Sequence, residues 1–452
     1  MAHQELPYDS SDKSSIVSYA QGLVGRTLRD LRPDLVVEDM HVRRGSFGNA
    51  VETYYFGLEP NNDPRPDFYE ADLELKTTPL KQLKNGRLAA KERLVLGMID
   101  YNTVVNEEFE SSHLAQKAKN ILLISYLWEK DKDPVDYKVL LADVIEPTDG
   151  DIEQFKRDWE TVVGKVRDGR AHEISGSDTL YLEACTKSSD SSVRRKQPFS
   201  DIGAKPRAWA LKASYMTAMQ NGMLEHAQSI QRADDERNLS LLELVRRRFS
   251  PYVGKSQDEL AQMFDYATEG RRAPKNLCAL ITRKILGVSD DSKIAEFEKA
   301  GIMPKTIRLK RSGRPKEALS FPRFDYMDFV TVDFDSSDFH ERLQQRYLFV
   351  IYREDEEGEY RLSDVCFWQM PDDDIDEAGR CYETFRQRVL SGHAEDSVKS
   401  SENRVAHVRP HARNNEDTCM TPYGVPVVKK CFWLNQDYLA GQIREALEAE
   451  GD

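Results

Sequence analysis

The sequence predicts an α/β protein made of two tandem domains, each with a mixed sheet flanked by helices. Three observations support this prediction. The chain has 452 residues, which exceeds the size at which one hydrophobic core usually keeps growing. Segments with strand and helix periodicity alternate along it. The second half also repeats the first at two nearly constant offsets, so the two domains should be copies of one fold.

The repeat sets the expected domain boundaries. LVGRTLRDL at 23–31 corresponds to YVGKSQDEL at 252–260, an offset of 229 residues. DIEQFKRDWETVVGKVRDGRAHE at 151–173 corresponds to DIDEAGRCYETFRQRVLSGHAED at 374–396, an offset of 223. We therefore predict one domain at 1–225 and another at 245–452, joined by a polar linker at 226–244.

The elements of each copy follow from periodicity. A helix is expected over 13–31 and a glycine-led helix over 45–56, because apolar residues recur there at helical spacing. Strands are expected at 72–78, 93–99, 120–128, 137–144, 346–354 and 366–370. Residues 151–168 carry apolar side chains at helical spacing again. The aromatic residues Trp159, Trp209 and Tyr215 are expected in the core, because aromatic residues recur at the matching positions of the second copy.

Composition narrows the class of protein. The net charge of −14 and pI of about 5.3 count against a protein that coats nucleic acid through bulk positive charge. They do not exclude local binding to a short duplex, which depends on how charge is distributed. The six cysteines are scattered without a CxxC pair, and we find neither a signal-peptide pattern nor a membrane-length apolar run. We expect reduced thiols, a cytoplasmic location and no membrane partner.

The strongest candidate for chemistry is PDFYEADLELKTTPLK, which contains Asp67, Glu74 and Lys76. Residues two apart on a strand face the same side, so Glu74 and Lys76 should project together, with Asp67 alongside across a bend. Two carboxylates can hold a hard cation such as Mg²⁺, and a lysine can orient or deprotonate one of its waters. The alternative is an ordinary solvated strand, because so short a motif often occurs by chance.

The second copy provides an internal comparison. At the offset of 229, Lys76 corresponds to Lys305, but Glu74 corresponds to Met303 and Asp67 to Glu296. Another acid, Glu52, corresponds to Ile281, or to Thr282 if the alignment slips by one residue. A lysine beside a methionine cannot hold a metal ion. Any active site is therefore expected in the first domain, and the second is expected to be catalytically inactive.

These residues also carry a family resemblance. GNAVETYYFG at 48–57, PDFYEADLELKTTPLK and AAKERLVLGMIDY at 89–101 closely resemble the MutH-like nucleases of the PD-(D/E)xK superfamily. Within that family the chain is most similar to two-domain restriction endonucleases that cut at GATC and whose second domain has lost its catalytic residues. The resemblance extends over essentially the whole chain.

The resemblance implies specific roles for residues of the first domain. Asp67, Glu74, the carbonyl of Leu75 and Glu52 would bind Mg²⁺, while Lys76 and Lys117 would be catalytic. A basic position of the family falls on Arg44, where a phosphate contact is implied. The expected contacts to duplex DNA are Arg194, Arg195, Lys196, Lys205, Arg207 and Lys212. Arg207 is the candidate base reader, since arginine paired with guanine is the commonest specific contact; each of these cations could instead be a surface charge.

The resemblance implies a type II restriction endonuclease that cleaves both strands at 5′-GATC-3′, leaving 5′-phosphate and 3′-hydroxyl ends. One active site per chain would require a second copy of the chain on the DNA. The inactive domain would bind a second site or support the dimer, and a cognate DNA methyltransferase would be a genetic partner. The alternatives are a mismatch-repair nickase and a DNA-binding protein without catalytic activity.

Overall fold

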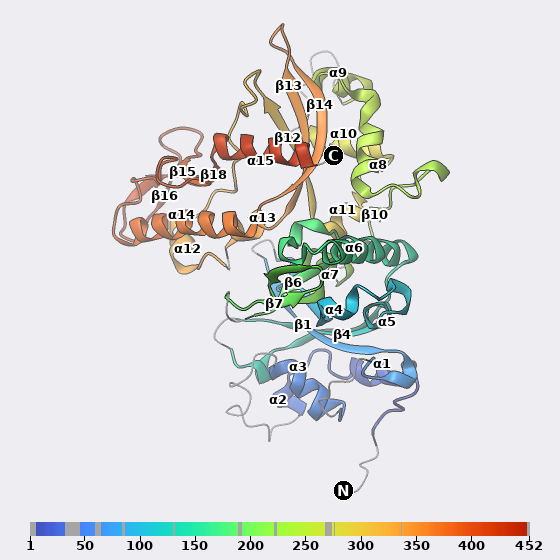
Figure 1. Ribbon diagram of the computed structural model, residues 1–452. Coiled ribbons are helices and arrows are strands. Elements are labelled where there is room, and N and C mark those ends of the chain that lie inside the picture. Colours follow the sequence, from blue (N-terminus) through green and yellow to red (C-terminus); the bar gives the residue numbers. More distant parts are fainter. Residues whose placement is uncertain are drawn as a thin grey trace. The chain divides into compact units, whose positions relative to one another are not determined.

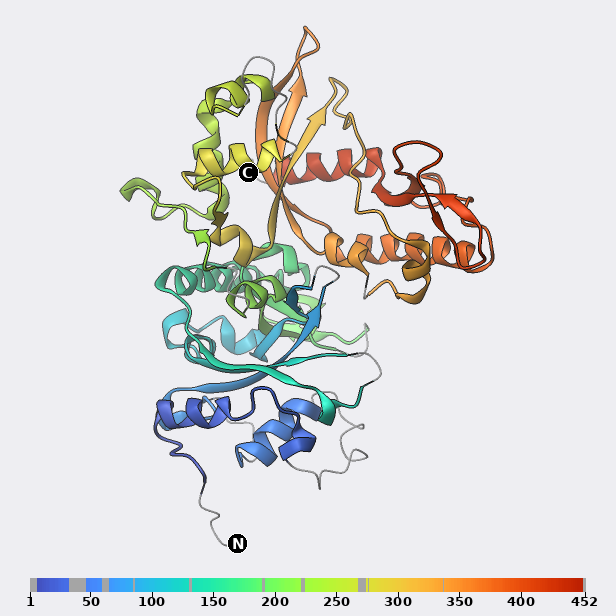
Figure 2. The same cartoon turned by 180° about the vertical axis from the view of Figure 1, so that it is seen from behind.

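The computed structural model divides into two compact units, which we describe separately. Unit 1 comprises Met1–Glu225 and Glu298–Ala300, and unit 2 comprises His226–Phe297 and Gly301–Asp452. Figures 1 and 2 follow the chain through both. The structure describes residues 6–31, 46–58, 65–83, 86–129, 132–188, 192–220, 224–266, 274, 276–335 and 337–449.

Unit 1 is built on a mixed sheet with the strand order β2-β1-β4-β5. The four strands are β1 (Glu74–Gln82), β2 (Leu88–Ala90), β4 (Ile121–Leu127) and β5 (Val139–Ile145). β1 and β4 are parallel, while the other pairs are antiparallel. A second sheet contains β3 (Leu94–Met98), β9 (Arg207–Leu211) and β6 (Leu182–Thr186), and β7 (Arg195–Gln197) forms a hairpin with β8 (Ser200–Ala204). The predicted mixed sheet is confirmed.

Helices cover both faces of the main sheet of unit 1. α1 and α3 lie on one side, and α4 to α7 lie on the other (Figure 1). Their bounds are α1 Lys13–Gln21, α2 Leu28–Leu31, α3 Ser46–Ala50, α4 Tyr101–Val104, α5 His113–Lys119, α6 Asp149–Arg167 and α7 Ala213–Gln220. α6 begins at a capping box between Thr148 and Asp151, and its apolar stripe, including Phe155 and Trp159, is buried.

Two predicted helices are irregular in the structure. The helix expected over 13–31 is interrupted between α1 and α2, because Gly25 adopts a φ of +82° and donates its N–H to the carbonyl of Val139. The helix expected over 45–56 continues after α3 as a π-helix, Val51–Tyr55, which carries Glu52. A π-helical turn is rare and often marks a functional site.

Unit 2 contains a mixed sheet with the order β12-β13-β14, in which β12 and β13 are parallel. The strands of this sheet are β12 Ile302–Leu309, β13 Arg346–Glu354 and β14 Tyr360–Gln369. Further along unit 2, β15 (Ala406–Pro410) pairs with β18 (Lys430–Leu434), and β16 (Thr418–Met420) pairs with β17 (Pro426–Val428). Its helices are α8 Leu241–Phe249, α9 Gln257–Met263, α10 Leu277–Leu286, α12 Tyr326–Thr331, α13 Asp338–Leu343, α14 Asp372–Leu390 and α15 Gln436–Ala449, and α11 Ala295–Ala300 spans the boundary between the units.

The structure confirms that the two units repeat one fold. Gly254 has a φ of +85° and donates to the carbonyl of Leu362, as Gly25 donates to Val139 in unit 1. α6 and α14 each have 19 residues. Equivalent backbone conformations therefore persist where the side chains have diverged.

The segment predicted to be a linker, 226–244, belongs to unit 2. β10 (Ala227–Gln228) pairs in parallel with β11 (Lys293–Ile294), Ile230 is buried, and α8 already begins at Leu241. Glu236 accepts hydrogen bonds from Arg248, and this contact lowers the pKa of Glu236 to about 2. The polar composition of this segment thus reflects ion pairs and caps within a folded unit.

Two general expectations can be compared with the structure. All six cysteines are free thiols. Among the helices that the structure describes, none is both long enough and apolar enough to cross a bilayer.

Candidate active site

The site is centred on Glu74, the first residue of β1, whose side chain is fully buried. Its Oε1 accepts hydrogen bonds from Nζ of Lys76 at 2.5 Å and from Nζ of Lys117 at 2.9 Å. Lys76 lies two residues further on the same face of the strand, as predicted. Lys117 comes from α5, which Ser112 caps by accepting from the N–H of Ala115.

Asp67 reaches the same place from the segment before β1. The chain reverses between Phe68 and Leu73, with Asp72 in the left-handed region at φ +49°. Oδ2 of Asp67 accepts from the backbone N–H of Leu75 at 2.9 Å and lies 3.8 Å from Nζ of Lys76. The bend postulated from the sequence therefore brings the second carboxylate beside the lysine.

Glu52 belongs to the same electrostatic cluster. Burial, followed by the charges of Asp67 and Glu74, raises the pKa of Glu52, and Lys76 partly opposes this. Burial also raises the pKa of Asp67; the positive charge of Lys76 opposes this shift, and the negative charge of Glu74 adds to it. Carboxylates that repel one another in a partly dehydrated site would be stabilised by a cation.

The donor set fits a hard divalent cation. Oε2 of Glu74 is buried without a hydrogen-bond partner, and such an orphaned oxygen calls for a ligand. Within the described part of the chain, however, no three acidic, His or Cys side chains already converge in a metal-ready arrangement. Oε1 of Glu74 is instead held by two ammonium groups. A metal ion would have the unpaired Oε2 of Glu74 available, while Oε1 stays paired with the two lysines.

The predicted DNA contacts fall into two groups. Arg194, Arg195 and Lys196 are exposed on and beside the β7–β8 hairpin, and Lys205 is also exposed. This placement permits the phosphate contacts that the resemblance implies. Arg44 lies outside the described residues.

Arg207 and Lys212 are placed differently from the prediction. Arg207 is only 8% exposed and donates to the carbonyls of Ala184 and Ile174. Nζ of Lys212 donates to the carbonyls of Gly176 and Thr179, both at 2.6 Å. Arg207 begins the buried strand β9 and Lys212 directly follows it, and both cations hold neighbouring backbone carbonyls in place. In this conformation the Arg207 guanidinium is bound to backbone carbonyls, so its assignment as a base reader stays a prediction.

Sequence reasoning also missed an exposed aromatic residue on this hairpin. Phe199, at the turn between β7 and β8, is 74% exposed and has a φ of +63°. Its carbonyl lies against Gly169, where an added Cβ would approach that oxygen to 2.5 Å. The sequence signal for this exposed turn was the dipeptide Pro198-Phe199, which lies between a basic run and a polar run.

The equivalent place in unit 2 has a different chemistry. Gly57 and Gly287 share a left-handed conformation after their helices, which fixes the local offset at 230 and aligns Glu52 with Thr282 rather than Ile281. The carboxylate of Glu296, the counterpart of Asp67, accepts hydrogen bonds from the backbone N–H of Ile230. Pro304, the counterpart of Leu75, has no N–H to hold an acid there.

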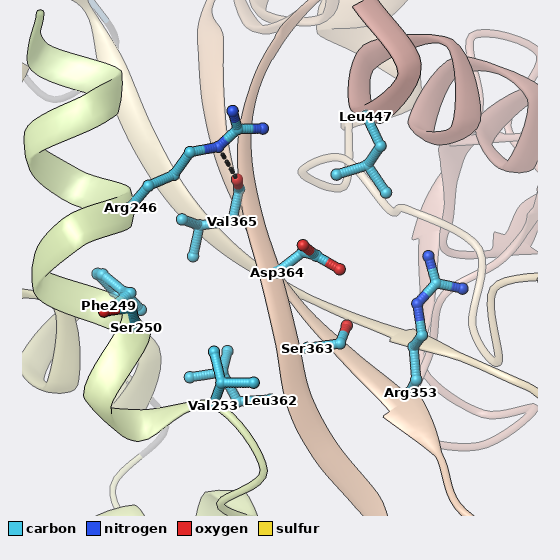
Figure 3. Close-up of a pocket in the computed structure, with 10 residues that line it drawn as sticks. All are labelled: Arg246, Phe249, Ser250, Val253, Arg353, Leu362, Ser363, Asp364, Val365 and Leu447. Carbon is cyan, nitrogen blue, oxygen red and sulfur yellow. Dashed lines mark hydrogen bonds between the residues drawn. The ribbon is translucent and has the colours of Figure 1, made fainter. Parts of the chain in front are cut away.

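A separate hollow of about 550 Å³ lies in unit 2 between α8, β14 and α15 (Figure 3). Arg246 borders it and donates to the carbonyl of Val365, and Asp364 is the one acid among its lining residues. It contains none of the candidate catalytic residues and has no pair of carboxylates suited to a metal ion.

Comparison with known proteins agrees with this arrangement. Residues 56–158 and 286–377 both match the family described as the DNA mismatch repair enzyme MutH. The two matches begin 230 residues apart, the same offset that relates Gly57 to Gly287. The chain is thus similar to the MutH family in two successive regions, as expected for two tandem domains of one fold.

Individual relatives differ in how much of the chain they match. The type II restriction enzyme Sau3AI of Staphylococcus aureus is 29% identical over 503 residues, covering 96% of this chain and 99% of that protein. The DNA mismatch repair protein MutH of Shigella flexneri serotype 5b (strain 8401) is 25% identical over 217 residues, covering 46% of this chain and 91% of its own length. MutH of Yersinia pestis (strain Pestoides F) is 26% identical over 222 residues, covering 47% of this chain and 94% of that protein.

Proposed function

We propose that the chain is a Mg²⁺-dependent type II restriction endonuclease that cleaves both strands of duplex DNA at 5′-GATC-3′, leaving 5′-phosphate and 3′-hydroxyl ends. The observation that carries this proposal is the cluster of Glu74, Asp67, Lys76 and Lys117 in a chain that aligns end to end with a type II restriction enzyme. The choice of GATC rests on the family resemblance.

Each residue has a role in this proposal. Asp67, Glu74, the carbonyl of Leu75 and Glu52 would hold the metal, whose charge would stabilise the negative charge that develops on the phosphate. Lys76 would hold the attacking water in line with the leaving 3′ oxygen. Lys117 would fix the carboxylate of Glu74 and contact the phosphate. The exposed residues Arg194, Arg195, Lys196 and Lys205 would contact the DNA backbone, as would Arg44.

A single competent site in each chain implies pairing of two chains on the palindrome. Unit 2 lacks the acids that correspond to Glu74 and Glu52, so one chain alone would cleave one strand per binding event. We therefore propose a dimer on DNA, with unit 2 contacting DNA without cleaving it. A cognate methyltransferase would protect the host sites, and a neighbouring gene for one would support this assignment.

Digestion of plasmid DNA tests the proposal. Unmethylated, adenine-methylated and cytosine-methylated plasmids are incubated with the purified chain and Mg²⁺, and the ends are sequenced. Linear products ending at GATC support the proposal. Products that are only nicked favour a mismatch-repair nickase, which the alignment with MutH proteins also permits, and metal-independent binding without any cleavage contradicts a nuclease.

A further inference from the structure

Unit 2 retains the two cations of the unit 1 site but not its acids. Lys305 occupies the position of Lys76 on β12, beside Met303 in the position of Glu74. Ser337 caps α13 by accepting from the N–H of His340, as Ser112 caps α5 in unit 1. The offset between the two caps is 225, so Arg342 corresponds to Lys117.

Arg342 reaches the same place as Lys117 does. Its NH1 donates to Sδ of Met303 at 3.2 Å, where Lys117 donates to Glu74 at 2.9 Å. Its other contact is with Oε1 of Gln345 at 3.4 Å. In the described part of the chain, neither Arg342 nor Lys305 forms an ion pair with a carboxylate.

Among the described residues, no carboxylate provides a counter-charge to this partly buried cationic pair. Burial, and then the nearby charge of Arg342, lower the pKa of Lys305. The buried Thr282, in place of Glu52, bonds to the carbonyl of Cys278 and brings no charge. A partly desolvated cation without an anion is unfavourable, so an incoming anion would stabilise this arrangement.

We propose that Lys305 and Arg342 form a binding site for a phosphodiester of duplex DNA that needs no metal ion. This inference rests on the proposed function. In that proposal unit 1 hydrolyses a phosphodiester, and the duplicated site of unit 2 would hold an equivalent phosphodiester without cleaving it. In unit 1 the carboxylates repel a phosphate until a cation is bound. In unit 2 methionine and threonine replace them, so the requirement for metal is lost together with catalysis.

The sharpest test exchanges a single side chain in the full-length protein. Met303→Glu would give Lys305 and Arg342 the partner that Lys76 and Lys117 have, and Met303→Gln is its uncharged control of similar shape. Binding of a fluorescent GATC duplex is measured by anisotropy in EDTA, where no cleavage occurs. We expect Met303→Glu to weaken binding about tenfold, the effect of losing one charge-assisted contact, with Met303→Gln close to the parent.

A second variant guards against a folding artefact. The double change Lys305→Ala with Arg342→Ala should make the logarithmic salt dependence of binding shallower by about 0.9 for each phosphate contact that is lost. Lys310→Ala with Lys399→Ala removes two exposed cations of the same unit and should leave the slope unchanged. Equal binding by Met303→Glu and Met303→Gln, with equal salt slopes for the two double variants, would overturn the inference.

Two further outcomes are distinguishable. Inorganic phosphate carries the same anion chemistry, so its effect on thermal unfolding is measured alone. A phosphate-induced shift that Met303→Glu abolishes without any change in DNA affinity would assign the site to free phosphate and overturn the DNA assignment. Cleavage of the same duplex by the parent with Mg²⁺ tests the proposed function separately: absent cleavage with intact binding in EDTA would refute the nuclease and not the phosphate site.

Discussion

Nζ of Lys117 lies 2.9 Å from Oε1 of Glu74, although 43 positions separate the two residues in the sequence. The contact connects α5 with the first residue of β1, and Lys76 shares the same carboxylate oxygen. The other oxygen of Glu74 has no partner. One buried carboxylate thus accepts hydrogen bonds from two lysines through one oxygen and still has a second oxygen available for a ligand.

Glu74→Gln tests whether this carboxylate is essential. The substitution keeps the shape but removes the charge, so we expect cleavage to fall about a thousandfold or more, because metal-ion catalysis supplies several kcal/mol of transition-state stabilisation. Single-turnover cleavage with Mg²⁺ measures the loss. Glu70→Gln, on the exposed surface of the preceding segment, is the control and should cleave like the parent. Full activity of Glu74→Gln would remove Glu74 from the mechanism.

Lys117→Met tests whether the lysine competes with metal. Removing one of the two ammonium groups on Glu74 leaves more uncompensated negative charge for a cation, so we expect Mn²⁺ to bind several-fold more tightly, while cleavage becomes slower because a phosphate contact is lost. Mn²⁺ binding is followed by electron paramagnetic resonance. Lys119→Met, an exposed lysine two residues away on α5, should change neither quantity. Weaker Mn²⁺ binding by Lys117→Met would show that Lys117 supports the metal site instead of competing for it.

The raised pKa of Asp67 predicts a pH-dependent stability. A carboxyl group whose folded pKa exceeds its unfolded value, about 3.9, contributes stability below the unfolded pKa and loses it as pH rises through the folded pKa. Without metal, Asp67→Asn should therefore raise the unfolding temperature relative to the parent at pH 7.5, and the difference should vanish near pH 3. Thermal unfolding in EDTA across this range measures it. A difference in unfolding temperature that grows as the pH falls would contradict a raised pKa of Asp67.

Much of the fold and the core of the site could be predicted from the sequence. The pairing of Glu74 with Lys76 follows from strand periodicity, and the duplication identified the domain without acids. The family resemblance implied a catalytic role for Lys117, but its contact with Glu74 was not predicted, since no local pattern relates a helix residue to a strand 43 positions away.

Other features depend on tertiary packing. The sequence of 226–244 is polar, yet the segment is folded because Glu236 pairs with Arg248 and Ile230 is buried. Arg207 stands in a basic segment, and only the burial of β9 shows that its guanidinium holds backbone carbonyls. Charge in a sequence does not show which way a side chain points, so these residues could not be assigned from composition.

Mixing of active and inactive chains tests the proposed division of labour between the units. If each chain cuts one strand, an excess of Glu74→Ala chains should pair with the parent on DNA and convert double-strand cleavage to nicking. Agarose gels of supercoiled plasmid, followed over time, distinguish open circles from linear DNA. Linear product that falls only in proportion to dilution of the parent, without accumulation of open circles, would mean that one chain cuts both strands.

Substitution of Arg207 should lower stability, whereas substitution of Arg195 should weaken DNA binding. Arg207→Ala leaves the carbonyls of Ala184 and Ile174 without this donor, and each buried unsatisfied group costs about 1–3 kcal/mol, so the unfolding free energy should fall by a few kcal/mol. Arg195→Ala removes an exposed charge and should change stability by less than about 0.5 kcal/mol while weakening DNA binding. Urea unfolding and anisotropy with a GATC duplex separate the two effects. A stable Arg207→Ala protein whose only defect is lost discrimination at one base pair would restore Arg207 as a base reader, with its guanidinium turned outward on DNA.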